Sequence, residues 1–210
     1  YSLLKFFNVD NNLLPEICDS FSNFGKTNNL DFLPDGITIS CILGDQQAAL
    51  FGQAGYNAGS LKCTYGTGAF ILLNTGDKKQ YSSNGLLTTV AYKHQGKVIY
   101  ALEGATYIAG AAVQWLRDNF GIVKDASEVE KLALEVKDLS KIKHLLFFPF
   151  FTGIGSPYWN SEAKGAIIGL TRDTGKSEIA RVCLEGMALS INDSITSLIE
   201  ESVDKVTEIK

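Results

Sequence analysis

The sequence predicts a layered α/β fold in which a mixed sheet is flanked by helices. Hydrophobic residues make up 45% of the 210 positions and charged residues 20%, proportions typical of a globular protein with a packed core. In the first half of the chain, short apolar runs flank glycine-containing turns, which predicts β-hairpins. In the second half, apolar residues recur at helical spacing. Hairpins followed by helices pack in layers, so the two halves together indicate an α/β domain.

The N-terminal part of the chain is expected to form a helix, a turn and an extended arm over residues 1–26. A run at residues 36–43, GITISCIL, has branched apolar side chains and no charge, which is typical of a strand covered on both faces. This strand is expected to end at Gly44. The next segment is rich in Ala, Leu and Gln and predicts a helix over residues 46–52.

Two hairpins are expected after this helix. The tip of the first is YGTG, in which Gly66 and Gly68 stand on either side of a threonine. The second turns near Gln95 and Gly96. The expected strands are 61–65 and 69–74 in the first hairpin and 85–92 and 98–103 in the second.

Three helices and two short strands are expected in the rest of the chain. Gly121 is a C-terminal stop for the first of these helices, and Ser127 is an N-cap for the second. The third carries a long inward stripe of apolar residues. The expected ranges are helices 106–120, 127–137 and 177–201 and strands 143–148 and 165–170.

The charge and hydropathy patterns exclude two classes of partner. Nineteen Lys and Arg against 23 Asp and Glu give a net charge of −4, so no basic face suited to nucleic acid is available. The longest apolar stretches, such as residues 145–151, are far shorter than the ~20 residues that span a bilayer. Residues 1–12 lack the order of a signal peptide. We therefore expect a cytoplasmic protein that acts on small molecules, with no nucleic-acid partner and no membrane insertion.

The cysteines and histidines do not form a metal-binding pattern. The four cysteines include no C-x-x-C pair, and His94 and His144 stand fifty residues apart. No zinc site and no metal-ligating residue are therefore expected. The cysteines are expected to be free, buried thiols in a reducing compartment.

Asp45 is the first candidate for chemistry. It follows Gly44 at the junction of the expected strand and helix, the position where open α/β sheets bind ligands. Its carboxylate could accept a proton from a hydroxyl that attacks a phosphoryl group. The alternative is that Asp45 caps the helix by accepting a backbone N–H. The two roles are compatible, and both stay open.

Glycines mark two further candidate positions. The YGTG tip would let main-chain N–H groups and the Thr67 hydroxyl approach phosphate oxygens, although the same pattern suits a turn that needs positive φ. Gly110 and Gln114 lie one helical turn apart on one face of the expected helix. A glycine in a helix costs about 1 kcal/mol relative to alanine. Gly110 therefore indicates close approach of another helix or of a flat ligand such as an adenine.

Several strings of residues, taken in order, resemble the glycerol kinases of the FGGY family of carbohydrate kinases. The resemblance covers nearly the whole chain and implies the actin-like, ribonuclease H-like ATPase fold, in which two α/β domains close on a cleft. It also implies transfer of the γ-phosphoryl group of ATP to a terminal hydroxyl of glycerol, with Mg²⁺, to give glycerol 3-phosphate. The strings are GDQQAALFGQ at 44–53, TYGTGAF at 64–70, NGLLTT at 84–89, YALEG at 100–104, QWLRD at 114–118 and GAIIGLTR at 165–172.

The resemblance also implies roles for individual residues. Asp45 matches the family's catalytic base, which also contacts the substrate, and Gln46 matches a glycerol contact. Phe70 matches the aromatic residue that packs against the carbon backbone of glycerol, whereas its residue type alone indicates a core position. The nucleotide-binding residues that the resemblance implies are Thr67, which contacts the phosphates, Gly110 and Gln114.

The domain organisation follows from the same resemblance. Residues 1–50 match the end of the family's first domain, and residues 51–210 match the front part of its second domain. Other substrate- and nucleotide-binding residues of the family lie outside the matching stretch, so the isolated chain is expected to be inactive. The full-length protein is expected to be a homo-oligomer, a dimer or a tetramer. Two alternatives stay open: a kinase for another polyol or a ketose, and a non-catalytic nucleotide-binding module.

Overall fold

The computed structural model describes residues 2–206 and 208–210, which form two compact units. The first unit contains residues 2–43 and a hairpin tip at Tyr92–Val98. The second contains Gly44–Ala91 and the chain from Ile99 onward. The predicted α/β fold, with a mixed sheet and flanking helices, is confirmed in the second unit.

The first unit consists mostly of loops. It begins with α1 (Ser2–Phe7), which is followed by a short 3-10 turn at Asn11–Leu13. Its hairpin tip turns at Gln95 and Gly96, as predicted, with φ angles of 51° and 76°. Positive φ at both central residues is the geometry that suits a two-residue hairpin turn.

The prediction of a buried strand at residues 36–43 is wrong. This segment forms only an isolated antiparallel bridge, between Lys26 and Thr38. Its other backbone hydrogen bonds join it to residues 20–27, and its isoleucine side chains are exposed. A strand covered on both faces needs packed layers above and below it, and this unit leaves the segment in solvent.

The cysteines are free, as expected, but they are not all buried. Cys18 and Cys41 are exposed because both belong to the loops of the first unit. Cys63 is half-buried in the sheet, and Cys183 is fully buried in a helix of the second unit. Burial raises the pKa of the Cys183 thiol to about 12.

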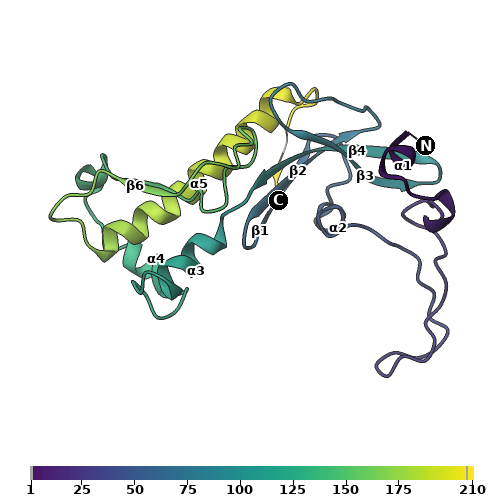
Figure 1. Ribbon diagram of the computed structural model, residues 1–210, viewed down its shortest axis with the longest axis horizontal. Coiled ribbons are helices and arrows are strands. Elements are labelled where there is room, and N and C mark those ends of the chain that lie inside the picture. Colours follow the sequence, from purple (N-terminus) through teal and green to yellow (C-terminus); the bar gives the residue numbers. More distant parts are fainter. Residues whose placement is uncertain (1, 207) are drawn as a thin grey trace. The chain divides into compact units, whose positions relative to one another are not determined.

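The second unit is built on a five-stranded sheet with the order β3-β4-β2-β1-β7 (Figure 1). Strand β1 pairs antiparallel with β2, which in turn pairs antiparallel with β4. The short β7 pairs parallel with β1, so the sheet is mixed. Both predicted hairpins are confirmed. The strands are β1 (Ser60–Tyr65), β2 (Ala69–Gly76), β3 (Leu87–His94), β4 (Lys97–Thr106) and β7 (Glu208–Ile209).

The two faces of this sheet are covered by different helices. Alternate side chains such as Leu61, Ile71 and Leu102 pack against Ile191 and Leu198 of α5 (Lys176–Glu201). The opposite face approaches α2 (Asp45–Gly52), which contacts β1 and β2. Because successive side chains of a strand point to opposite faces, one face is apolar core while the other is free to carry polar groups.

A second core lies between the long helix and the elements that follow β4. It joins α3, α4, α5 and the two-stranded sheet of β5 and β6. In Figure 1, α5 runs from this cluster to the five-stranded sheet, so one helix contributes to both cores. The elements are α3 (Gly110–Asp118), α4 (Glu128–Ala133), β5 (Leu146–Phe148) and β6 (Ala166–Ile168), with a 3-10 turn at Leu139–Ile142.

The long helix and both short strands of this half occur where they were predicted, but two helices are shorter than expected. Helix α3 begins at Gly110 and not at residue 106, because β4 continues to Thr106. Its apolar pattern overlaps the end of a buried strand, and periodicity alone does not separate the two. Helix α4 ends at Ala133, four residues before the expected end.

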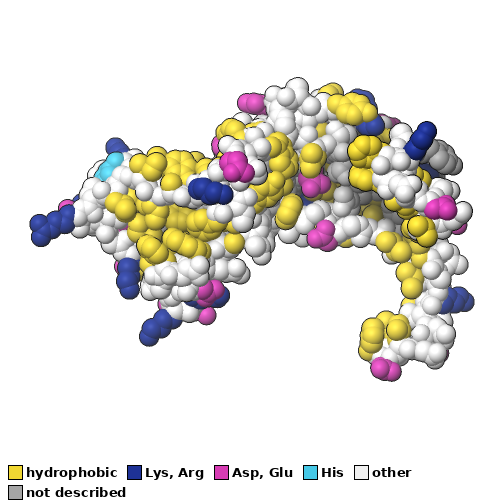
Figure 2. Space-filling view, in the orientation of Figure 1, with side chains coloured by type: hydrophobic (Ala, Val, Ile, Leu, Met, Phe, Trp, Pro, Cys, Tyr) yellow, Lys and Arg dark blue, Asp and Glu magenta, His cyan; other side chains and the backbone are white. Residues whose placement is uncertain are grey.

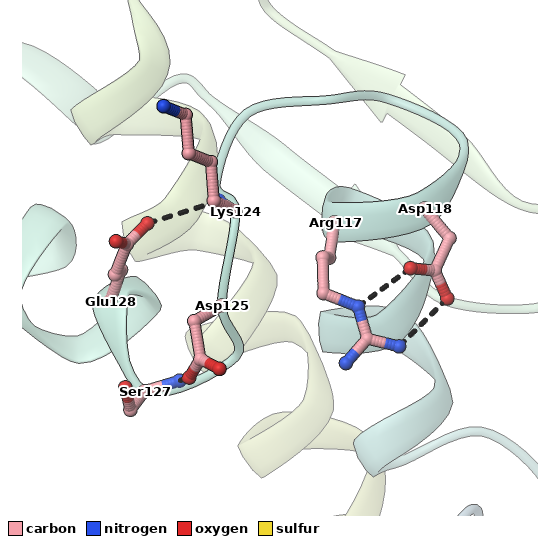
Figure 3. Close-up of polar contacts among 6 residues, drawn as sticks. All are labelled: Arg117, Asp118, Lys124, Asp125, Ser127 and Glu128. Carbon is pink, nitrogen blue, oxygen red and sulfur yellow. Dashed lines mark hydrogen bonds and ion pairs between the residues drawn. The ribbon is translucent and has the colours of Figure 1, made fainter.

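Polar contacts hold the connection between α3 and α4 (Figure 3). Ser127 precedes α4, as predicted for a cap, but its side chain makes no capping bond. The Asp125 carboxylate accepts from the Ser127 amide at 2.8 Å, and the Glu128 carboxylate accepts from the Lys124 amide at 3.0 Å. These side chains hold the loop before α4, whereas the Glu128 and Val129 amides of the helix donate to the carbonyls of Asp125 and Ala126.

Exposed apolar side chains gather over β6 and α5 (Figure 2). They include Leu146, Ile168 and Leu189, each about half exposed. Within residues 2–206 and 208–210, no helix is long and apolar enough to cross a membrane.

Candidate functional site

Asp45 is the first residue of α2, directly after the N-cap Gly44. Its side chain is exposed. Oδ1 accepts a hydrogen bond from the backbone N–H of Gln46 at 2.8 Å, and Oδ2 lies 3.4 Å from Gln46 Nε2. The carboxylate thus bonds to the first turn, as the capping alternative requires, and it also remains accessible to a hydroxyl from solvent.

A buried lysine anchors the neighbour of Asp45. Lys62, on β1, is 1% exposed, and its ammonium donates to Gln46 Oε1. It also donates to Thr64 Oγ1 at 3.0 Å and to the Phe70 carbonyl at 3.3 Å. An ammonium group has three donors, so every donor of Lys62 is used. Lys62 therefore links α2, β1 and β2 on one face of the sheet.

The strand register places a glutamate in the same row. Lys62 pairs with Leu72 on β2, and Leu72 pairs with Glu103 on β4, so the three side chains share the face that α2 covers. Burial lowers the pKa of Lys62 and raises that of Glu103, and the attraction between the two groups opposes both shifts. Asp45 favours the charged lysine and disfavours a charged Glu103.

Phe70 lies beside this lysine and not in the core. It pairs with Thr64 across the first hairpin and is half-buried on the α2 face. Gln46 and the Phe70 backbone share Lys62 as a donor. The structure thus brings together Asp45, Gln46 and Phe70, the three residues that resemble the family's substrate site.

The glycine tip packs against the beginning of α3. The amides of Ala109 and Ala111 donate to the Thr67 carbonyl, and the Gly110 amide donates to the Gly66 carbonyl, at 2.8–3.1 Å. These amides are therefore engaged inside the protein. The Thr67 side chain remains exposed at the tip. Thr67 and Gly110 are thereby brought together, as their predicted common role requires.

Close approach explains the glycines of this contact. A Cβ on Gly68 would lie 2.5 Å from the Thr106 carbonyl oxygen, and one on Gly110 would lie 2.6 Å from that of Gly66. Neither Gly66 nor Gly68 has φ in the left-handed region, so the alternative of a turn that needs positive φ does not hold. Tight packing at Gly110 is confirmed, and its partner is a hairpin tip where another helix was expected.

Gln114 lies one turn beyond Gly110 on α3, with its side chain exposed. No hydrogen bond joins it to the tip in the described part of the chain. The described residues also contain no group of three or more His, Cys, Asp or Glu side chains that could hold a metal ion.

Lys62 and Glu103 were missed in the sequence. The signal that points to Lys62 is a single lysine between Leu61 and Cys63 in an otherwise apolar strand. Such a lysine more often faces solvent at a sheet edge. Its burial becomes evident only when β1 is known to lie between two other strands.

Known proteins are similar to this chain in sequence over most of its length. The sequence model for the C-terminal domain of the FGGY family of carbohydrate kinases matches residues 61–210. The glycerol kinase of Bdellovibrio bacteriovorus is 51% identical over 197 residues, which cover 93% of this chain and 39% of that protein. The glycerol kinase of Thermococcus gammatolerans is 48% identical over 208 residues, or 99% of this chain and 40% of that protein.

Solved structures show the same relationship. The crystal structure of Plasmodium falciparum glycerol kinase with ADP matches all of this chain and 42% of its own, with a TM-score of 0.84 and 38% identity. A ligand-bound xylulose kinase from Lactobacillus acidophilus has a TM-score of 0.76 at 20% identity, over 99% of this chain and 42% of that one, and so shares the fold. The chain spans about two fifths of the length of the curated relatives it matches. From its matching family domain and its relatives, the chain belongs to the FGGY family of carbohydrate kinases.

Proposed function

We propose that the full-length protein containing this chain is an ATP-dependent glycerol kinase and that Asp45 is its catalytic base. The observation that carries the proposal is the exposed Asp45 carboxylate at the start of α2, bonded to Gln46 on the sheet face that also holds Phe70. The names of the relatives and of the ADP-bound structure support the choice of substrates.

The reaction needs one group of the protein that accepts a proton from glycerol. As a terminal hydroxyl of glycerol attacks the γ-phosphorus, a new O–P bond forms, the bond to the β–γ bridging oxygen breaks, and ADP leaves. Asp45 accepts the hydroxyl proton and later releases it to solvent. The exposed carboxylate of Asp45 is accessible to such a hydroxyl.

The other candidate residues hold the two substrates. Gln46 offers an amide to a glycerol hydroxyl, while Phe70 offers an apolar face to the carbon backbone. The exposed Thr67 hydroxyl is a donor for the nucleotide phosphates, and Gly110 and Gln114 border the nucleotide on α3. Mg²⁺ bound with the nucleotide would neutralise charge that develops on the phosphates. We also propose that the protein is cytoplasmic and homo-oligomeric, as a dimer or tetramer.

The proposal is tested with Asp45→Asn in the full-length protein. Loss of the base should reduce kcat for glycerol phosphorylation about 10²- to 10⁴-fold, the usual contribution of general base catalysis. The dissociation constant for glycerol, measured by calorimetry, should stay within a few-fold. Asp173→Asn, at an exposed turn far along the chain, is the matched control and should leave kcat unchanged. Unchanged turnover in Asp45→Asn would overturn the assignment of the base.

A substrate panel separates the two alternatives. A kinase for another polyol or a ketose would phosphorylate that compound with a higher kcat/KM than glycerol. A non-catalytic module would bind ADP in calorimetry and release no ADP from ATP with any compound of the panel. The Asp45–Gln46 pair favours glycerol, because two polar groups beside an aromatic ring suit a small triol.

A further inference from the structure

Lys62 is the most deeply buried charged side chain beside the candidate site, and the mechanism above does not use it. It is 1% exposed, and all three ammonium donors are satisfied by Gln46, Thr64 and the Phe70 carbonyl. Burying a charge is costly unless it is hydrogen-bonded and paired. Leu72 occupies the neighbouring position on the same face as a simple apolar residue. The same face of the sheet thus carries an apolar side chain on β2 directly beside the buried lysine of β1.

The chemistry of the ammonium determines how the Gln46 amide is oriented. An ammonium only donates, so the atom that faces it must be the amide oxygen, Oε1. The amide nitrogen then points away from Lys62, and Nε2 lies 3.4 Å from Asp45 Oδ2. Without Lys62, the amide could turn over, because its oxygen and nitrogen have nearly the same shape.

The same ammonium also holds the second half of the site. Its bond to the Phe70 carbonyl, at 3.3 Å, joins the backbone of β2 to the side chain from α2. Asp45 and Glu103 both favour the charged form of Lys62 and so offset part of the cost of its burial. Lys62 thus has the charge and the bonds to set the distance between Gln46 and Phe70.

We propose that Lys62 is a positioning residue for the substrate: its ammonium orients the Gln46 amide and ties it to the Phe70 backbone, without touching glycerol itself. This inference rests on the proposed function, because it assigns Gln46 and Phe70 to the substrate. The role needs the hydrogen bonds of the ammonium and not only its bulk.

The first test is Lys62→Met in the full-length protein, because methionine fills a similar volume without charge or donors. We expect kcat/KM for glycerol to fall at least tenfold, mainly through KM, as for the loss of a charge-assisted hydrogen bond. KM for ATP should stay within about twofold. A merely structural role would lower the amount of active enzyme, and therefore kcat, with both KM values unchanged. Lys164→Met, at an exposed loop position, is the matched control and should behave as the unmutated protein.

A double-mutant cycle tests whether Lys62 acts through Gln46. In a Gln46→Ala background there is no amide to orient, so the further change Lys62→Met should alter KM for glycerol less than about threefold. An equal loss in both backgrounds would overturn the proposal. A rise in KM for ATP would also overturn it, because it would place Lys62 at the nucleotide.

A spectroscopic measurement tests the same role without kinase activity. In protein labelled with ¹⁵N-glutamine, the Gln46 Nε2 protons, assigned by their absence in Gln46→Ala, should exchange with solvent more slowly in the unmutated protein than in Lys62→Met. Equally fast exchange in the two proteins would overturn the positioning role. If no compound is phosphorylated but the signals are protected, the proposed function fails while the amide is still held by Lys62.

Discussion

At the start of α3, Gly110 leaves no space for a side chain. We expect Gly110→Ala to lower the free energy of unfolding by about 1–3 kcal/mol, because the new Cβ would lie 2.6 Å from the Gly66 carbonyl oxygen and the backbone must shift. Because the tip carries Thr67, KM for ATP should rise as well. Chemical denaturation and initial-rate kinetics measure the two effects.

Gly52 is the matched control for this substitution. It is the last residue of α2, and nothing lies within 4 Å of a Cβ built on it. Gly52→Ala should therefore be neutral or stabilising by up to about 1 kcal/mol, the gain in helix propensity. If both variants had the same stability, the close approach at Gly110 would not constrain the fold.

Some residues of the candidate site could be predicted from the sequence, and others could not. Asp45 was predicted from its position between Gly44 and a helix, and the structure places it at the start of α2 with an accessible carboxylate. Lys62 was not predicted, because the neighbours that make a lysine functional come from α2 and β2. Residue type and local order predict a capping or catalytic carboxylate, whereas a buried cation is recognised only from its partners.

At the scale of elements, the end of α5 is bonded to the loop before β3. One oxygen of Glu201 accepts hydrogen bonds from the Ser83 amide and hydroxyl and from the Asn84 amide. Burial alone would raise the pKa of Glu201, but bonds from Ser82, Ser83 and Asn84 outweigh it and hold the pKa below its ordinary value. The ionised carboxylate therefore stabilises the contact between helix and loop.

This contact predicts a pH dependence of stability. Because the folded pKa of Glu201 is lowered, its contribution is present above the ordinary value of 4.5 and is lost as the pH falls through the folded pKa. At pH 7, Glu201→Gln should lower the free energy of unfolding by about 1 kcal/mol, because a neutral amide replaces the charged carboxylate and its hydrogen bonds are weaker. The difference from the unmutated protein should shrink below pH 4.5 in denaturation experiments. Glu200→Gln, at the exposed neighbouring position, should show no such dependence.

The elements also show which patterns predict structure reliably. Both hairpins and the long helix were predicted close to their observed bounds, because glycine turns and a helical stripe over many residues are local signals. The run at residues 36–43 has an equally clear apolar pattern and yet forms no strand. A strand needs hydrogen-bonding neighbours, and its own sequence does not supply them.

At the scale of the whole molecule, we expect the isolated 210-residue chain to lack kinase activity. Phosphoryl transfer depends on positioned groups around both substrates, and the chain spans about two fifths of its relatives. A coupled assay with glycerol and MgATP should detect no ADP release above background from the chain alone. The full-length protein, assayed at the same concentration, is the control. Steady turnover by the isolated chain would show that these residues suffice.

The sequence by itself determined the family, the α/β class, the hairpins and the candidate residues Asp45, Gln46, Thr67, Phe70, Gly110 and Gln114, whose roles stay predictions. These features follow from short motifs and from the spacing of apolar residues, and both are properties of residues that are neighbours in the chain. Only the tertiary structure decided that Lys62 is buried between α2 and the sheet, and that the glycine tip meets the start of α3. Contacts of this kind join segments far apart in the chain, and their energies depend on burial and register that no single segment specifies.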